Sequence, residues 1–185
     1  MAAQVFQRCY GLETIGLRYF NVFGPRQDPH GAYSAVIPRW IKALLTGAPV
    51  QVFGDGSSSR DFCYVENVVQ ANLLAGVVHN VAAPHQVFNI AVGERTDLLT
   101  LHRTLCELLG VCEIADQRGP QFLPGREQDI AHSHADISRA MAVLGYRPSH
   151  TLRQGLVLAL PWYRAISAMR GQASVKRHAP RAARP

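Results

Sequence analysis

The stretch Gly54–Val69, GDGSSSRDFCYVENVV, joins a glycine-serine loop to a charged pair and a strand of buried character. The pair, Arg60-Asp61, directly precedes the apolar run Phe62–Val65. Burying either charge is costly unless it has a partner. An arginine fork beside a glycine-rich loop suits a phosphate or pyrophosphate group. An internal Arg60–Asp61 ion pair that pins the loop explains the pattern equally well, and the residues alone leave both interpretations open.

The segment before this loop predicts a helix followed by a buried strand. Residues 2–10 have helical character and stop at Gly11, a suitable C-cap. A chain seldom begins with the last turns of a helix, so we expect an upstream segment to be missing. Thr14–Phe23 is rich in β-formers and nearly continuously apolar, which predicts one interior strand of a parallel sheet. Ligands in open α/β sheets bind beyond the carboxyl ends of strands, which places Asn21 near a ligand; a turn-capping asparagine is the alternative.

Helix and strand periods alternate along the rest of the chain. Helices are expected at 35–45, 68–78, 97–109, 137–144 and 152–169, and strands at 50–53 and 87–91. Residues 119–134 are polar and irregular, and residues 171–185 have the composition of a disordered tail.

The net charge of +6 belongs almost wholly to the C-terminus. Five of the 19 basic residues lie in the last 16 positions, whereas all 13 acidic residues precede residue 137. The body therefore carries +1 and the tail carries +5. A basic tail without a basic groove is poor evidence for nucleic-acid binding, so we expect no nucleic-acid partner.

Cysteine usage and hydropathy predict a cytoplasmic protein. The four cysteines, Cys9, Cys63, Cys106 and Cys112, form no C-x-x-C motif, and their apolar neighbours predict buried, reduced thiols. No apolar run approaches the ~20 residues that span a bilayer, so no membrane span is expected. The first residues also lack the charged start and apolar centre of a signal peptide.

Several catalytic motifs are missing from the sequence. Lys42 and Lys176 are the only lysines, and neither is preceded by a tyrosine four residues earlier, so there is no Tyr-x-x-x-Lys acid/base pair. Gly54 and Gly56 are not followed by a glycine at Ser59, so the dinucleotide fingerprint fails. There is no Walker A loop and no Gly-x-Ser-x-Gly elbow.

A metal site is the other chemistry that the residues allow. His132 and His134, with Asp129 and Asp136, are residue types that bind metals, but their spacing matches no strong zinc or facial-triad motif. We therefore expect no metal.

Four separated motifs resemble one superfamily. They are LRYFNVFGP at Leu17–Pro25, RDFCYV at Arg60–Val65, FNIAVG at Phe88–Gly93, and the element Ala135–Pro148 that ends in LGYRP. Together they resemble the extended short-chain dehydrogenase/reductases that act on nucleotide sugars. Within that group, RQDPHGAYSAVIPRW at residues 26–40 is most similar to bacterial UDP-N-acetylglucosamine 4-epimerases of surface-polysaccharide pathways.

The resemblance implies an α/β fold that corresponds to the C-terminal part of such an enzyme. Residues 1–166 are expected to form an incomplete Rossmann-like parallel sheet with a small α/β substrate-binding domain, and residues 167–185 a basic disordered tail. In the family, the N-terminal half holds NAD and the Tyr/Lys pair. NAD is therefore expected to be held mainly by a half that this chain lacks.

The resemblance also implies a set of binding residues. Two arginines, Arg60 and Arg126, are expected to bind the pyrophosphate, and Asn21 to bind near the phosphates and the sugar. Asp129 is expected to bind a ribose hydroxyl or to orient Arg126. The uridine pocket is expected to be lined by Ala35, Val36 and Trp40. Further substrate contacts are expected from Gln27, Arg95 and Ser133, and contacts with the nicotinamide side of the cofactor from Tyr19 and Phe20.

The last motif departs from the family pattern. The family usually has Arg-x-Gly-Asp, whereas this chain has Gln128 in Arg126-Glu127-Gln128-Asp129. If the family requires the backbone freedom of glycine there, Gln128 strains or redirects the loop. This puts the expected role of Asp129 in question more than that of Arg126.

Three functions are compatible with these observations. The first is the nucleotide-sugar-binding part of a UDP-N-acetylglucosamine/UDP-N-acetylgalactosamine 4-epimerase, inactive alone because the NAD loop and the Tyr/Lys pair are absent. The second is a non-catalytic UDP-sugar-binding or dimer-partner module, including a homodimer. The third is a decaying gene product that folds poorly. A nucleotide-sugar dehydratase or a UDP-glucuronate 4-epimerase is the related enzyme alternative.

Overall fold

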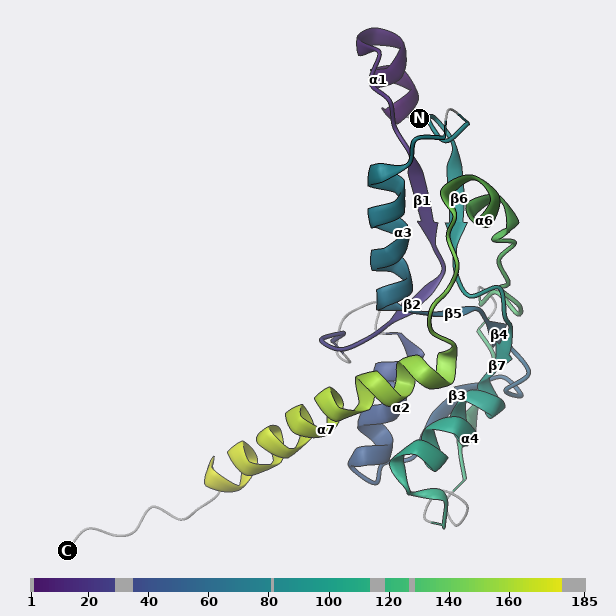
Figure 1. Cartoon of the computed structure of the whole chain (residues 1–185). Coiled ribbons are helices and arrows are strands. Elements are labelled where there is room, and N and C mark those ends of the chain that lie inside the picture. Colours follow the sequence, from purple (N-terminus) through teal and green to yellow (C-terminus); the bar gives the residue numbers. More distant parts are fainter. Residues whose placement is uncertain (1, 29–34, 81, 114–118, 127–128, 178–185) are drawn as a thin grey trace, which may run out of the picture.

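The computed structural model describes residues 2–28, 35–80, 82–113, 119–126 and 129–177 (Figure 1). The helices are α1 Ala2–Tyr10, α2 Val36–Leu45, α3 Val65–Val77, α4 Leu98–Leu109, α6 Ser138–Leu144 and α7 Leu152–Arg177. The strands are β1 Gly16–Tyr19, β2 Asn21–Phe23, β3 Gln51–Phe53, β4 Ser59–Arg60, β5 Phe62–Tyr64, β6 Val87–Ile90, β7 Thr96–Asp97 and β8 Gln121–Leu123.

The strands pair mainly in parallel, as the α/β fold class predicts. β1 pairs with β6, β2 with β5, and β3 with β8, all parallel, whereas the short strands β4 and β7 are antiparallel. Figure 1 shows α3 beside β1 and α6 beside β6, with α2 and α4 gathered under the start of α7. Helices α3 and α6 therefore pack on the β1–β6 pair, whereas α2, α4 and α7 pack on one another.

Two apolar clusters hold these parts together. One lies around the β1–β6 pair and includes Phe88, Ile90 and Tyr146, each fully buried. The other lies among α2, α4 and α7 and includes Trp40 and Leu105. Burial of apolar surface, which contributes about 25 cal/mol of free energy per Å², is the main force that stabilises both clusters.

The segment predicted as one strand, Thr14–Phe23, is two strands in the structure. β1 ends at Tyr19, and the N–H of Phe20 still donates to the carbonyl of Ile90 (3.1 Å). The next N–H, that of Asn21, donates instead to the carbonyl of Asp61 (3.2 Å). The chain thus changes its pairing partner from β6 to β5 at this point. Asn21 begins a strand and does not end one, so that prediction was wrong in detail.

Asp61 forms no ion pair with Arg60, which removes one of the two interpretations of that pair. Its carboxylate is fully buried and accepts hydrogen bonds from the backbone N–H groups of Val92 (3.0 Å), Gly93 (3.1 Å) and Ala135 (3.3 Å). Burial raises the pKa of Asp61, and the three N–H donors oppose that rise. The side chain ties three separate segments together.

The C-terminal half differs from the prediction at two places. Residues 121–123, expected to be irregular, form β8 against β3, although the side chains of Gln121 and Phe122 are exposed. Helix α7 continues through Pro161 to Arg177, so residues 171–177 are helical and were wrongly predicted as disordered. Adding residues to an existing helix costs little, which explains the extension. Residues 178–185 lie outside the described part of the chain.

Smaller differences from the prediction concern the first residues of two helices and the exposure of one cysteine. α3 begins at Val65, three residues before its expected start. α6 begins at Ser138, and Asp136 accepts from the N–H of Ser138 (2.9 Å). None of the four cysteines forms a disulfide; Cys63 and Cys106 are buried as predicted, Cys112 is partly buried, and Cys9 is exposed, which contradicts the prediction. In the described residues no helix has the length and apolar character to cross a membrane.

Candidate functional site

A cavity of about 250 Å³ opens where β2, α2, β3 and β4 meet the segment that follows β8. Residues from five distant parts of the sequence line it. The predicted binding residues among them are Asn21, Ala35, Val36, Trp40, Arg60, Arg126 and Asp129. The structure therefore brings seven of the expected residues into one cavity.

Helix α2 forms one wall of this cavity. Val36 and Trp40 lie four residues apart on one helical face, and both line the cavity. The indole N–H of Trp40 donates to the carbonyl of Gln51 (3.0 Å), and only 2% of the side chain is exposed, so the ring is fixed. Ala35 occupies the N-cap position without a side-chain acceptor. The first turn of α2, in which Pro38 has no N–H, thus carries no side-chain cap, and a helix N-terminus favours an anion.

Arg60, the last residue of β4, also lines the cavity. Its Nη1 donates to the carbonyls of Ser59 (2.9 Å) and Ala131 (3.1 Å), which orients the guanidinium. The next residue, Asp61, lies between β4 and β5. Its carboxylate accepts from backbone N–H groups of Val92, Gly93 and Ala135 and does not pair with Arg60.

Arg126 lies over an aromatic ring that the sequence analysis did not single out. Its Cζ atom is 3.9 Å from the centroid of the Phe53 ring, a cation–π geometry. Phe53 lines the cavity, and so does Gln51, while the intervening Val52 is fully buried. The alternation of the short strand at 50–53 was the available signal for Phe53.

The charges that line the cavity are mainly positive. The lining residues in the described ranges include three arginines, Arg39, Arg60 and Arg126, and one carboxylate, that of Asp129. Arg39 was not predicted from the sequence. Three guanidinium groups around one hollow favour an anionic ligand with planar or forked oxygen groups.

Other predicted substrate residues lie outside this cavity. Gln27 donates from Nε2 to the carbonyl of Val22 (3.2 Å), and its buried Oε1 has no partner in the described residues. Arg95 is exposed, and Ser133 donates its backbone N–H to the carbonyl of Ser59 (2.9 Å). None of the three is among the lining residues.

The two predicted cofactor residues also lie apart from the cavity. Tyr19 ends β1 with 46% of its side chain exposed, and its hydroxyl donates to Oδ1 of Asn72 (3.0 Å). Phe20 is half-buried and packs on the cluster around β1 and β6. One of the two, Tyr19, is thus accessible to a large ligand.

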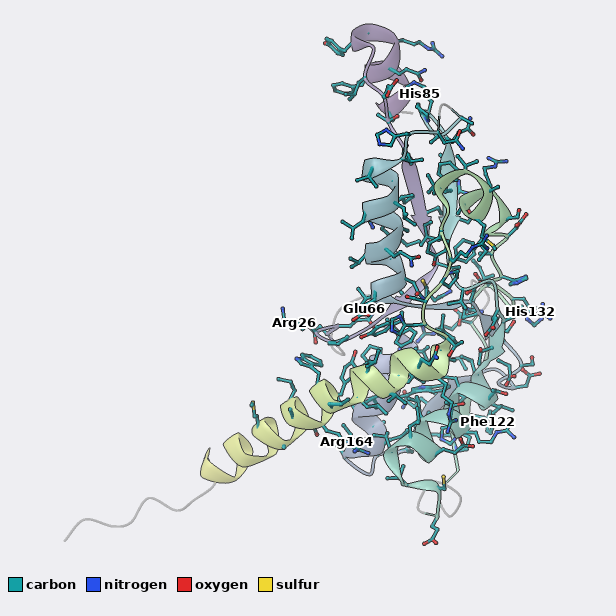
Figure 2. All side chains as sticks on the ribbon, viewed as in Figure 1. Arg26, Glu66, His85, Phe122, His132 and Arg164 are labelled. Carbon is teal, nitrogen blue, oxygen red and sulfur yellow. The ribbon has the colours of Figure 1, made fainter. Side chains whose placement is uncertain are left out.

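The histidines of the discarded metal hypothesis have other partners. Nδ1 of His132, labelled in Figure 2, lies 2.9 Å from Oγ of Ser59. Nε2 of His134 lies 3.1 Å from the carbonyl of Gly93. The described residues contain no group of three His, Cys, Asp or Glu side chains that could hold a metal ion. The question raised by Gln128 falls on a residue outside the described ranges.

Comparison with known proteins relates this geometry to one family. The model of the NAD dependent epimerase/dehydratase family matches residues 1–91. UDP-glucose 4-epimerase of Mycolicibacterium smegmatis is 34% identical over 160 residues, which are 86% of this chain and 48% of that protein.

Two solved structures are similar over most of the chain. UDP-glucose 4-epimerase of Thermotoga maritima, solved with UDP-glucose, has a TM-score of 0.80 and 37% identity, and the match covers 90% of this chain and 50% of that one. UDP-N-acetylglucosamine 4-epimerase of Methanobrevibacter ruminantium, solved with UDP-N-acetylmuramic acid, has a TM-score of 0.80 and 34% identity, covering 89% and 50%.

The chain spans about half the length of the curated relatives that it matches. Sequence and fold agree over that half. The chain belongs to the NAD-dependent epimerase/dehydratase family and has the Rossmann-type fold of the extended short-chain dehydrogenase/reductases.

Proposed function

We propose that this chain is the nucleotide-sugar-binding part of a UDP-sugar 4-epimerase that acts in the cytoplasm in surface-polysaccharide biosynthesis. UDP-N-acetylglucosamine and UDP-N-acetylgalactosamine are the proposed substrates. One observation carries the proposal: the cavity collects seven binding residues expected from the family resemblance, from Asn21 to Asp129. Its three arginines against one described carboxylate match a ligand that carries a diphosphate.

The cavity lining offers hydrogen-bond donors for a diphosphate and apolar surface for a base. Arg60 and the first turn of α2 provide donors for the diphosphate, and Asn21 can reach the phosphates or the sugar. Val36, Trp40 and Phe53 provide apolar and aromatic surface for the base. The Asp129 carboxylate is an acceptor for a ribose hydroxyl. The walls thus suit the parts of one nucleoside diphosphate sugar.

The residues described here fit NAD only as one edge of its site. Tyr19 gives an exposed aromatic ring at the carboxyl end of β1, where an open α/β sheet binds ligands. The sequence contains neither the dinucleotide fingerprint nor a Tyr-x-x-x-Lys pair. When bound, NAD supplies the hydride acceptor and donor for inversion at the sugar C4. This chain alone is therefore proposed to bind the nucleotide sugar without turning it over.

Calorimetric titration of the purified 185-residue chain tests the proposal. UDP-N-acetylglucosamine is expected to bind, and Arg126→Gln to weaken that binding roughly ten-fold, the value of one charge-assisted hydrogen bond. Arg139→Gln is the matched control, because Arg139 is exposed on α6 and does not line the cavity. A folded chain that binds no UDP-sugar would refute the function. Turnover of the sugar in the presence of NAD would refute only its proposed inactivity.

The same titration tests one of the related enzymes. Of the two alternatives, a nucleotide-sugar dehydratase and a UDP-glucuronate 4-epimerase, the second uses a different hexose on the same UDP group. Tighter binding of UDP-glucuronate than of UDP-N-acetylglucosamine would favour the second of these. Equal binding of all UDP-sugars would show that this part recognises the nucleotide and leaves the sugar to the rest of the site.

A binding or dimer-partner module is the second candidate, and one surface favours it. Val69, Leu73 and Val77 form an exposed row at four-residue spacing along α3. In the described residues, β1 pairs on one side only, with β6. An exposed apolar row beside an open strand edge favours association with another polypeptide. Light scattering of the purified chain distinguishes a monomer from a homodimer.

A further inference from the structure

A second cavity, of about 620 Å³, lies between α2 and α7. Its volume is typical of sites that bind apolar groups. None of its lining residues lines the candidate functional site, so the proposed nucleotide sugar makes no use of it. Its apolar lining comes from both helices and consists of Ile41, Leu45, Trp162, Tyr163 and Ile166.

An apolar stripe runs along α7 from this cavity toward the end of the helix. Trp162 and Ile166, four residues apart, are both partly exposed and line the cavity. Met169 follows three residues after Ile166, and 64% of its side chain is exposed. Residues at spacings of three, four and seven share one face of a helix. Trp162, Ile166 and Met169 therefore form a single row, called here the α7 stripe.

The far end of the α7 stripe lies away from the body of the molecule. Figure 1 shows the last turns of α7 projecting beyond α2 and the other described elements. The Trp162 ring is held at the near end, because it packs edge-on against the ring of Tyr163, with 4.9 Å between the centroids. The row thus leads from an apolar cavity to an exposed helix end.

The charges around the α7 stripe are mainly positive. Arg26 and Lys42 line the second cavity together with one carboxylate, that of Asp28. Helix α7 contains five basic residues and no acidic one, and no acidic residue follows position 136 in the sequence. Three of the basic residues belong to the last turns of the helix: Arg170, Lys176 and Arg177.

This combination favours one kind of partner. A second copy of the chain would bring two positive faces together, which like-charge repulsion opposes. A hydrated polyanion would meet the charges and leave the α7 stripe in water. The surface of an anionic bilayer offers negative headgroups and an apolar interior within one boundary layer, and tryptophan is enriched at that depth.

We propose that the α7 stripe and the rim of the second cavity dock this chain on an anionic lipid bilayer. Trp162, Ile166 and Met169 enter the boundary between headgroups and acyl chains. Arg26 and Lys42 lie among the headgroups, with the basic end of α7 beside them. The helix lies in the plane of the surface, as basic amphipathic helices do. The inference requires no nucleotide in the candidate functional site.

Sedimentation with sucrose-loaded vesicles tests this on the 185-residue chain. One set of vesicles is phosphatidylcholine, and the other contains phosphatidylglycerol as a quarter of its lipid. The chain is expected to bind the anionic vesicles at least roughly ten-fold more tightly, because each basic residue near such a surface contributes about five-fold. Raising the salt to about 0.5 M should weaken this binding, because it screens the headgroup charge.

Tryptophan fluorescence gives a second measurement of the same event. The chain has two tryptophans, and Trp40 is only 2% exposed. A shift of the emission to shorter wavelength on adding anionic vesicles is therefore expected from Trp162. Brominated acyl chains should quench the same emission, which places the ring below the headgroups.

Met169→Glu should weaken binding to the anionic vesicles by roughly ten-fold or more, because it removes apolar burial and adds a repelled charge. Val157→Glu is the matched control. Val157 also lies on α7 with 52% of its side chain exposed, but twelve residues earlier and about 120° around the helix. It should change the affinity by less than about two-fold. Arg26→Gln should weaken binding about five-fold, and Arg139→Gln, on exposed α6, should not.

Three outcomes would overturn the inference and leave the proposed function standing. The first is a chain with native circular dichroism that binds neither vesicle, or both equally. The second is an equal loss in Met169→Glu and Val157→Glu, which would mean that added negative charge acts anywhere on α7. The third is salt-sensitive binding that survives Met169→Glu without a fluorescence shift, which would mean that charge alone holds the chain, as on any polyanion.

Discussion

The guanidinium carbon of Arg126 lies 3.9 Å from the centroid of the Phe53 ring, and both residues line the candidate cavity. Phe53 comes from β3, and Arg126 from the segment after β8, the strand that pairs with β3. The pairing of these two short strands therefore sets the contact. A flat base that enters the cavity meets this aromatic face or displaces the arginine from it.

Replacing Phe53 with leucine should weaken UDP binding. An aromatic face contributes about 1–3 kcal/mol to the binding of one base, so Phe53→Leu is expected to lower the affinity for UDP by roughly ten-fold or more. Calorimetry on the purified chain measures this. Weakened binding of UDP with unchanged binding of inorganic pyrophosphate would assign the effect to the base.

Phe122→Leu is the matched control. Phe122, labelled in Figure 2, lies on β8 and pairs in register with Val52, next to Phe53. Its side chain is 52% exposed and does not line the cavity. The same substitution on the neighbouring strand should leave the affinity for UDP unchanged. Equal losses in the two variants would mean that Phe53 acts by stabilising the strand pair.

Elements with strong local signals could be predicted from the sequence. For α4, the apolar spacing, the N-cap Asp97 and the left-handed C-cap Gly110 are all encoded locally, and the structure has each of them. The cavity residues were expected because the family resemblance identified them as a set. Their convergence, however, depends on the pairing of strands that are far apart in the sequence.

The errors occurred where remote partners decide the structure. The break between β1 and β2 exists because Asn21 bonds to Asp61 instead of continuing along β6. β8 has exposed side chains, so no apolar pattern indicated it. The choice between the two interpretations of the Arg60–Asp61 pair depended on backbone N–H groups more than 30 positions away.

Asp61→Asn should destabilise the fold. The carboxylate accepts from the N–H groups of Val92, Gly93 and Ala135, and an amide would direct its own N–H toward one of these donors. Loss of hydrogen bonds to a buried charged acceptor is expected to lower the free energy of unfolding by about 2–3 kcal/mol. Urea unfolding measures it, with Glu94→Gln, on an exposed residue, as the control. A change no larger than that of the control would contradict the tying role of Asp61.

Thiol labelling at pH 8 should divide the cysteines by burial. Cys9 is exposed and should react first with Ellman's reagent. Burial raises the pKa of Cys63 to about 11, so its thiolate is scarce as well as inaccessible. Cys63 and the buried Cys106 should react only after denaturant is added. Rapid reaction of all four thiols in the native protein would show that the β1–β6 core is open in solution.

Tyr163 should make the fold sensitive to alkali. Its hydroxyl donates to the carbonyl of Gly24 (2.8 Å), and burial raises its pKa to about 12, above the ordinary value of 10.0. Because the pKa is higher in the folded state, the contribution of Tyr163 is complete below pH 10 and is lost as the pH rises toward 12. Tyr163→Phe should therefore reduce the slope of unfolding free energy against pH in that window by up to about 1.4 kcal/mol per pH unit. The substitution should also lower the free energy of unfolding by about 1 kcal/mol at pH 7, because the hydrogen bond to Gly24 is lost.

Tyr10→Phe, at a tyrosine that is 76% exposed, is the control and should change neither quantity. An unaltered slope in Tyr163→Phe would mean that the hydroxyl is accessible to water in solution, and that α7 is not held against the end of β2 as the Tyr163–Gly24 bond requires.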